Sequence, residues 1–215
     1  MHEANALARW NGDGAVRLLA RHEKGNSMLL ERAIPGKPLA NVNADAALDV
    51  LVGLLPRLWR PATRPFRALA DEAVWWASYL EAAWRRLAQP FDSGLIDTAL
   101  DAIRSLAPDQ GEQVLLHQDL HAANVLSAQR EPWLVIDPKP LVGEREFGIA
   151  PIVRSKELGH GRADVEYRLD RLTSDLGLDR ERARLWTIAQ TVAWAFEGDS
   201  YLAGHIETAE WLVRA

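Results

Sequence analysis

The chain contains no cysteine among its 215 residues. Disulfide bonds, thiolate metal sites and cysteine nucleophiles are therefore excluded. No apolar run approaches the roughly 20 residues that a membrane-spanning helix needs. The N-terminal stretch MHEANALARW also lacks the apolar core of a signal peptide. From these absences we expect a cytoplasmic protein with no membrane partner.

Neither sign of charge predominates in the sequence. The chain has 25 Lys and Arg residues against 30 Asp and Glu residues, which gives a formal net charge of -5. The two signs are interleaved, and this argues against nucleic acid as a partner. A cationic ligand is compatible with the balance, although an ordinary solvated surface explains it as well. The hydrophobic fraction of 48% is usual for a soluble globular protein with a sizeable core.

The N-terminal part of the chain is predicted to contain one helix and two strands. The helix covers residues 3–10, and the strands cover residues 15–22 and 26–33, with the turn EKGN between them. Two prolines and a glycine in the next segment, IPGKPL, break regular structure. We therefore predict a boundary there, with residues 1–35 as one unit and residues 36–215 as the other.

The second unit is predicted to be mainly helical, with a β-type insert in its middle. Helical spacing of apolar residues covers residues 44–59, 71–88 and 93–107 before the insert, and about 149–158, 164–176, 180–196 and 206–214 after it. Ser93 is the expected N-cap of the third helix. The insert consists of the short β-type runs QVLLH, NVLS and WLVID, and the turn AQREP joins the last two.

Polar residues are concentrated in this insert. The stretch VLLHQDLHAANVLS places His117, Asp119, His121 and Asn124 between apolar runs, and Asp137 follows the next predicted strand. If the last two strands form a hairpin, its far end returns Asp137 close to Asn124. One carboxylate and one amide oxygen then converge, which suits Mg²⁺ with water and phosphate oxygens as its other ligands. Asp119 would stand nearby as a carboxylate that can orient or deprotonate a hydroxyl group.

This arrangement resembles the protein-kinase catalytic core, which has a catalytic-loop aspartate, an asparagine five residues later and a metal-binding aspartate after the next strand. The segment HQDLHAANVL has a histidine two residues after Asp119, where eukaryotic protein kinases usually carry lysine. That feature is typical of the small-molecule branch, the aminoglycoside and choline kinases. The segment WLVIDPKPLVGEREFGIAPIVRS is similar to the streptomycin 6-phosphotransferase and hydroxyurea phosphotransferase group, in which IDPK replaces the protein-kinase DFG.

The resemblance to the aminoglycoside phosphotransferase family implies a protein-kinase-like α+β fold. It has a truncated small β lobe and a mainly α-helical large lobe that carries a catalytic β-hairpin. It also implies ATP and Mg²⁺ as cofactors, and an aminoglycoside or similar small molecule as the hydroxyl acceptor. By position, Asp119 matches the catalytic base, and Asn124 and Asp137 match the Mg²⁺ ligands.

Further positions take supporting roles from the same resemblance. His117 matches the histidine that braces the catalytic loop, and His121 matches the second loop histidine of the family. Lys139 could reach a phosphate or the acceptor. The remaining matches are the hinge backbone of Glu31, Arg32 and Ala33 around adenine, Glu3 at the helix glutamate that pairs with the ATP-binding lysine, and Glu197 and Asp199 as acceptor-binding acids.

The sequence departs from the family pattern at two places. No Gly-x-Gly-x-x-Gly segment occurs, and only two residues precede Glu3. The glycine-rich loop and the strand lysine of the family are therefore missing, and we expect a poorly ordered N-terminal region on a stable helical lobe. Gly148 stands where many phosphotransferases of this type carry an aspartate that braces the catalytic loop. We expect His117 to rely on backbone groups instead.

Two other interpretations remain open. Without the glycine-rich loop and the lysine, the chain is also compatible with a truncated, catalytically inactive kinase remnant. His117, Asp119 and His121 alternate, and alternation places side chains on one face of a strand. That pattern is also compatible with a metal-dependent hydrolase. Taken singly, Asp and Asn residues favour turns, so the chemical interpretation depends on Asp119, Asn124 and Asp137 acting together.

Overall fold

The structure is a computed structural model that describes residues 2–22 and 27–215, so the predicted turn EKGN lies outside the described residues. The N-terminal part contains α1 (Glu3–Trp10), β1 (Leu18–Arg21) and β2 (Met28–Leu30), and the two strands pair antiparallel. The predicted helix is therefore confirmed, and the two predicted strands exist but are shorter than residues 15–22 and 26–33. Asn11 ends α1 in the left-handed conformation, with φ at 48°, and its N–H bonds to the Leu7 carbonyl.

Three helices follow the proline-containing segment, as predicted. They are α2 (Ala44–Leu58), α3 (Leu69–Arg86) and α4 (Ser93–Leu106), and a 3-10 turn, η1 (Leu39–Asn41), precedes them. The predicted cap of α4 is wrong by one residue. Asp92 keeps an extended backbone before the helix and accepts a hydrogen bond from Gly94 N–H at 2.7 Å, while Ser93 is already helical.

The insert forms two small sheets. In the first, β4 (Gln113–Leu116) pairs antiparallel with β7 (Leu141–Glu144), which pairs parallel with β3 (Arg67–Ala68). In the second, β5 (Val125–Ser127) and β6 (Trp133–Val135) form the predicted hairpin, with Val125 opposite Val135. Strand β7 was not predicted.

The C-terminal part contains η3 (Arg145–Ile149), α5 (Ala150–Val153), α6 (Arg162–Leu176), α7 (Arg180–Ala193), β8 (Phe196–Glu197), β9 (Ser200–Tyr201) and α8 (Ala203–Val213). The predicted helix at residues 149–158 is therefore too long. The Arg168 guanidinium takes the Val153 and Leu158 carbonyls as acceptors, so the chain leaves the helical path there. The helix predicted to reach residue 196 ends at Ala193.

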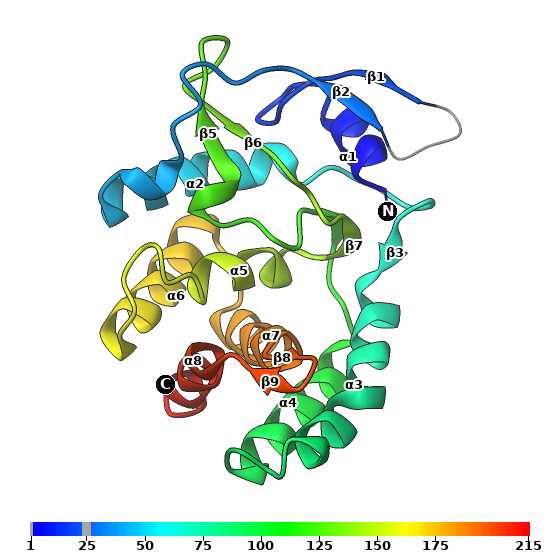
Figure 1. Ribbon diagram of the computed structural model, residues 1–215, viewed down its shortest axis with the longest axis vertical. Coiled ribbons are helices and arrows are strands. Elements are labelled where there is room, and N and C mark those ends of the chain that lie inside the picture. Colours follow the sequence, from blue (N-terminus) through cyan, green and yellow to red (C-terminus); the bar gives the residue numbers. More distant parts are fainter. Residues whose placement is uncertain (1, 23–26) are drawn as a thin grey trace.

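Figure 1 shows the arrangement of these elements. The strands β1, β2, β5 and β6 lie with α1 at one end of the molecule, and the helices α3, α4, α7 and α8 lie at the other. Aromatic rings fill the core of the helical end, where Phe147 packs against Trp76 at 5.9 Å and against Trp186 at 5.5 Å between ring centroids. No helix of the described residues has the length and apolar character needed to cross a membrane.

The N-terminal part is attached to the β5–β6 hairpin by backbone hydrogen bonds. Val16 N–H donates to the Val135 carbonyl at 3.0 Å, and Val135 N–H donates to the Gly14 carbonyl at 2.9 Å. On the other strand of the hairpin, Gly36 N–H donates to the Ser127 carbonyl at 3.0 Å. Both strands of the hairpin are therefore held by residues that precede α2, which places the predicted site next to the N-terminal part.

Candidate active site

Asp119 lies in the loop between β4 and η2 (Ala122–Asn124) and is only 9% exposed. The preceding residue, Gln118, adopts the left-handed conformation with φ at 65°. Gln190 on α7 fixes this bend, because its side-chain amide donates to the Gln118 carbonyl at 3.1 Å. Left-handed backbone at a non-glycine residue is found preferentially at functional sites.

His117 supports the loop through backbone groups, as the glycine at position 148 led us to expect. Its Nε2 donates to the Ile136 carbonyl at 2.9 Å, and its Nδ1 accepts from Asp119 N–H at 3.3 Å. Trp10 of α1 stacks on the imidazole, with ring centroids 6.2 Å apart and planes 12° apart. Burial lowers the pKa of His117 to about 4, so the ring is neutral at physiological pH.

The β5–β6 hairpin brings the backbone of Asn124 to Ile136, the residue before Asp137. Asn124 donates its side-chain amide to the Asp119 carbonyl at 2.9 Å, and its own carbonyl accepts from Ile136 N–H at 3.0 Å. Asp137 follows immediately in the left-handed conformation, with φ at 53°. Because the Asn124 amide nitrogen is engaged, its oxygen is the atom left for a ligand.

Two cations neutralise the Asp119 carboxylate. Lys139 forms an ion pair with Oδ2, and Arg154 places Nη2 3.5 Å from Oδ1. Both cations also lie over the Trp194 ring, Arg154 at 4.5 Å and Lys139 at 5.5 Å from its centroid. Arg154 is 7% exposed, and burial lowers its pKa to about 10.

The charge state of Asp119 follows from these neighbours. Burial by itself raises the pKa of this carboxyl group. The hydrogen bond and charge of Lys139 act in the opposite direction, together with the charges of His121 and Arg154, and the net pKa lies below its ordinary value. Asp119 is therefore ionised at neutral pH and able to accept a hydrogen bond from a substrate hydroxyl.

Glu157 is a site residue that the sequence did not reveal. Its carboxylate accepts from His121 Nδ1 and from Ala123 N–H, both at 2.9 Å. It therefore holds the loop between Asp119 and Asn124 from the segment that follows α5. The contact spans 36 residues of sequence to His121 and has no local signature. Arg154 and Trp194 were missed for the same reason.

The predicted hinge, residues 31–33, lies directly after β2. Its three backbone N–H groups differ in whether they already have a hydrogen-bond partner. Glu31 N–H already donates to the Arg17 carbonyl at 2.9 Å, and its carboxylate pairs with Arg130. This ion pair fixes the Glu31 side chain to the turn between β5 and β6. The N–H groups of Arg32 and Ala33 form no backbone hydrogen bond within the described residues, so they can serve a ligand.

Glu3 on α1 lies close enough to Asp137 for their charges to interact. Burial raises the pKa of Glu3, and the negative charge of Asp137 raises it further. No lysine or arginine of the described chain forms an ion pair with Glu3. The carboxylates of Glu3 and Asp137 and the amide oxygen of Asn124, whose backbone bonds to Ile136 next to Asp137, are all hard oxygen donors, and their chemistry fits Mg²⁺.

Glu197 and Asp199 do not end a long helix as predicted. Glu197 is the last residue of β8 and Asp199 lies in the tight turn to β9, where Gly198 adopts a φ of 55°. Both acids are exposed, and neither carboxylate forms an ion pair within the part of the chain that the structure describes.

The hydrolase interpretation is contradicted by the geometry. Across residues 2–22 and 27–215, no group of three His, Cys, Asp or Glu side chains could hold a metal ion. His117 in particular has both ring nitrogens committed to backbone groups. A histidine-rich transition-metal site is therefore not formed.

Comparisons with known proteins identify relatives of this chain. A sequence profile of the family described as aminoglycoside/hydroxyurea antibiotic resistance kinase matches residues 1–199. A streptomycin 6-kinase of Streptomyces griseus is 42% identical over 201 residues, covering 89% of this chain and 65% of the relative. A hydroxyurea phosphotransferase of Kitasatospora aureofaciens is 40% identical over 194 residues, covering 88% of this chain and 56% of the relative. The chain thus spans less than two thirds of the length of these relatives.

Solved structures share the fold. A thermostable mutant of aminoglycoside phosphotransferase APH(4)-Ia superposes with a TM-score of 0.61 at 17% identity, covering 99% of this chain and 81% of the other. The choline kinase LicA from Streptococcus pneumoniae superposes with a TM-score of 0.66 at 13% identity, covering 98% and 79%. The predicted protein-kinase-like fold is confirmed.

Proposed function

The chain belongs to the aminoglycoside/hydroxyurea antibiotic resistance kinase family, and from that membership we propose that it takes part in transferring the γ-phosphate of ATP to a hydroxyl group of a small molecule, an aminoglycoside such as streptomycin. The observation that carries the proposal is the convergence of three residues. Asn124 bonds to the Asp119 carbonyl at 2.9 Å and accepts from Ile136 N–H, next to Asp137, at 3.0 Å.

Asp119 orients the acceptor hydroxyl and takes its proton during transfer. Its carboxylate is ionised because Lys139 and Arg154 outweigh the effect of burial on its pKa. Lys139 is 47% exposed at its side chain and is able to turn from Asp119 toward a phosphate oxygen. Arg154 is buried and stacked on Trp194, so it stays with Asp119.

The Asn124 amide oxygen and the Asp137 carboxylate would hold Mg²⁺, which when bound supplies positive charge to phosphate oxygens. We assign the adenine contacts to the backbone of residues 31–33, chiefly to the N–H groups of Arg32 and Ala33. Residues 1–35 then belong to the nucleotide-binding lobe and hinge, and residues 36–215 form the catalytic and acceptor lobe. A structure of aminoglycoside phosphotransferase APH(4)-Ia holds ADP and hygromycin B, which supports a nucleotide and an aminoglycoside as ligands of this fold.

The acceptor is assigned from the charge of the residues on the β8–β9 hairpin. Streptomycin is cationic, and the exposed carboxylates of Glu197 and Asp199 on the β8–β9 turn offer negative charge beyond the stacked Trp194. We place the acceptor between this turn and the catalytic loop. Mass spectrometry of streptomycin incubated with ATP, Mg²⁺ and the protein detects the phosphorylated product.

Calorimetry with ADP, in the presence and absence of Mg²⁺, tests the assigned roles. We expect Asp137→Asn to remove the Mg²⁺-dependent gain in affinity, about tenfold or more, because the metal loses a charged ligand. Asp119→Asn should leave nucleotide affinity unchanged and lower the transfer rate by about 10²–10³. Asp97→Asn, at an exposed position of α4 outside the proposed site, is the control for loss of one carboxylate. Equal ADP affinity with and without Mg²⁺ in the unsubstituted chain would reject the metal assignment.

A binding protein that transfers no phosphate is the second candidate. It is favoured by Glu3, whose carboxylate meets Asp137 and no lysine within the described residues. In the kinase fold that glutamate pairs with a lysine that holds phosphates. Binding of Mg²⁺ and ADP without any phosphorylated product would support this candidate over the first.

A further inference from the structure

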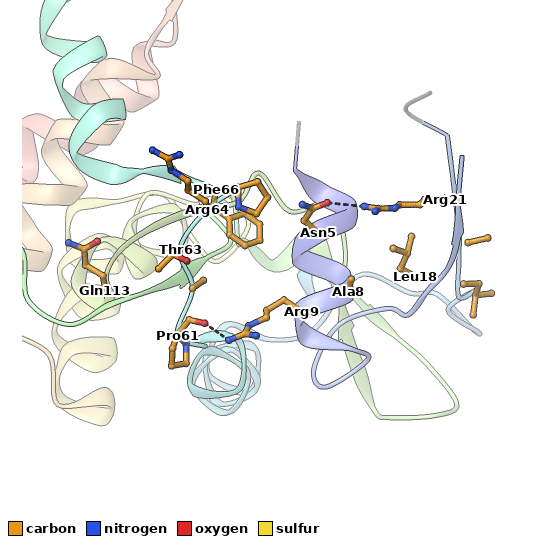
Figure 2. Close-up of a pocket in the computed structure, with 14 residues that line it drawn as sticks. Asn5, Ala8, Arg9, Leu18, Arg21, Pro61, Thr63, Arg64, Phe66 and Gln113 are labelled. Atoms are coloured by element: carbon orange, nitrogen blue, oxygen red, sulfur yellow. Dashed lines mark hydrogen bonds between the residues drawn. The ribbon is translucent and has the colours of Figure 1, made fainter. Parts of the chain in front are cut away.

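A cavity of about 1160 Å³ opens on the side of α1 that faces away from the catalytic loop. It is bounded by α1, by β1 and by the segment from Pro61 to Phe66 that leads into β3, and Gln113 closes one end. Figure 2 shows Asn5 and Arg9 on α1, with Leu18 and Arg21 to one side and Pro61, Thr63 and Phe66 to the other. No residue assigned to the candidate active site lines it.

Much of the wall of this cavity is apolar. Leu18 and Leu19 contribute from β1, and Pro61, Pro65 and Phe66 contribute from the facing segment. Leu19 is 58% exposed, although a side chain of this size is usually buried. A concave surface with this lining and of a volume comparable with the roughly 300–1,000 Å³ of known small-molecule sites is suited to an apolar ligand body.

The charge of the cavity is of one sign. Arg9, Arg21 and Arg64 line it, and no Asp or Glu of the described residues 2–22 and 27–215 does, although the chain as a whole carries a net charge of -5. The three arginines come from three separate parts of the fold. None of them forms an ion pair with a carboxylate of the described residues. The three exposed guanidinium groups give the rim of the cavity a local positive charge, which favours an anionic ligand over a cationic one.

The hydrogen bonds of these arginines leave donors available. Arg9 Nη2 donates to the Pro61 carbonyl at 2.6 Å, which joins α1 to the facing segment across the cavity. Arg21 Nη1 donates to Asn5 Oδ1 at 3.2 Å. A guanidinium group has five N–H donors, so both side chains keep donors for a ligand. The Arg64 side chain forms no hydrogen bond within the part of the chain that the structure describes.

From the apolar wall and the three arginines we propose that this cavity binds a small organic anion with an apolar body, a carboxylate or a phosphate ester. The apolar body lies against Leu18, Pro65 and Phe66, and the anionic group bonds to the guanidinium groups. A macromolecular partner fits less well, because the apolar surface is concave and enclosed on two sides by α1 and the facing segment.

Fluorescence titration with anilinonaphthalene sulfonate tests the proposal, since this dye joins an aromatic body to one negative charge. We expect saturable binding by the unsubstituted chain, and the uncharged phenylnaphthylamine should bind about tenfold more weakly. Arg21→Ala combined with Arg64→Ala should weaken dye binding by about tenfold. Arg104→Ala combined with Arg214→Ala changes the net charge equally at sites outside the cavity and should leave dye binding unchanged.

A second variant tests the apolar wall. Ala8 is exposed on α1 and lines the cavity, so Ala8→Trp fills the space without disturbing the core and should abolish saturable binding. Excess ADP with Mg²⁺ should leave the dye bound, which separates this cavity from the proposed nucleotide site. Octanoate and octyl phosphate then compete with the dye, and the stronger competitor identifies the preferred anionic group.

Several results would overturn the proposal. Equal binding of the charged and uncharged dyes would show that the arginines do not select an anion. Unchanged binding in the arginine variant or in Ala8→Trp, with native circular dichroism, would place the dye elsewhere. Amide shifts on dye binding should concentrate at Leu18, Ala62 and Phe66, and shifts confined to the catalytic loop would also reject the assignment.

Discussion

Lys139 forms an ion pair with Asp119 across 20 residues of sequence. The pair exists because the β5–β6 hairpin brings the chain back after Asp137, where Lys139 N–H donates to the His117 carbonyl at 3.0 Å. The cation of the IDPK segment is therefore fixed by its backbone beside the catalytic loop. Its side chain remains 47% exposed, so only the backbone position is rigid.

Removing the Lys139 charge should raise the pKa of Asp119. Burial favours the protonated carboxyl group, and Lys139 is the strongest of the groups that oppose this effect. We expect Lys139→Met to shift the titration of the Asp119 carboxyl carbon to higher pH in NMR spectra. Lys37→Met removes a lysine outside the site and is the control. An unchanged Asp119 titration in Lys139→Met would show that Arg154 alone keeps the carboxylate ionised.

Arg168 should be essential to stability. This residue of α6 is 1% exposed, and it donates to the carbonyls of Val153, Leu158 and Gly159 at 2.9–3.1 Å. These carbonyls bracket the segment that carries Arg154 and Glu157. Arg168→Leu leaves them without partners, so we expect the free energy of unfolding to fall by about 3 kcal/mol or more in urea denaturation.

The matched control for Arg168 lies on the same helix. Arg171 pairs with Asp175 and Asp49 at the surface, where solvent weakens ion pairs. Arg171→Leu should therefore change the unfolding midpoint far less than Arg168→Leu. If the two variants are destabilised equally, the buried hydrogen bonds of Arg168 do not account for its contribution.

His117 should make the protein less stable in mild acid. The pKa of His117 in the folded chain, about 4, lies below its ordinary value of about 6.5. Between these two values the unfolded chain binds a proton at His117 and the folded chain does not. Stability is complete above about pH 6.5 and decreases as the pH falls toward 4, by about 3 kcal/mol in all from this group. NMR of the ring nitrogens should show the neutral Nε2–H form from about pH 6.5 until the pH nears the folded pKa of about 4. Protonation of His117 near pH 6.5 would contradict this account.

Removing the Glu3 carboxylate should stabilise the chain at neutral pH. The folded pKa of Glu3 is raised by burial and by Asp137, so the ionised group opposes folding above its ordinary pKa and ceases to do so in acid. We expect Glu3→Gln to raise the thermal midpoint at pH 7 and to have no effect near pH 4. The gain should be below about 1 kcal/mol, because Glu3 is partly exposed. Asp13→Asn would be destabilising by contrast, since Asp13 pairs with Arg57 and Arg60.

The hairpin and its polar residues could be predicted because their causes are local. Two β-type runs flank a five-residue turn, and a hairpin of this kind necessarily returns Asp137 to Asn124. The spacing of Asp119 and Asn124 within one loop is likewise visible in the sequence. The long helices could also be predicted from local sequence, because the residues on the buried face of each helix are apolar and recur with the helical period.

The missed features depend on contacts between distant parts of the chain. Glu157, Arg154 and Trp194 reach the catalytic loop only after α5, α6 and α7 have packed. The predicted helix at residues 149–158 was too long because Arg168 removes its carbonyl acceptors, and no local pattern reveals that competition. The replacement of a family aspartate by Gly148 could be seen in the sequence. The structure shows that the Trp59 indole lies 3.1 Å from the position where a Cβ would be.

Arg130 gives the turn of the β5–β6 hairpin an unusual sensitivity to lengthening. Surface turns commonly accept inserted residues at little cost. Here the guanidinium group holds Glu31 and the carbonyls of Gly12 and Ala15. A peptide tag placed beside Arg130 would displace these three contacts at once and loosen the segment at Glu31 after β2, even though the tag itself would extend into solvent.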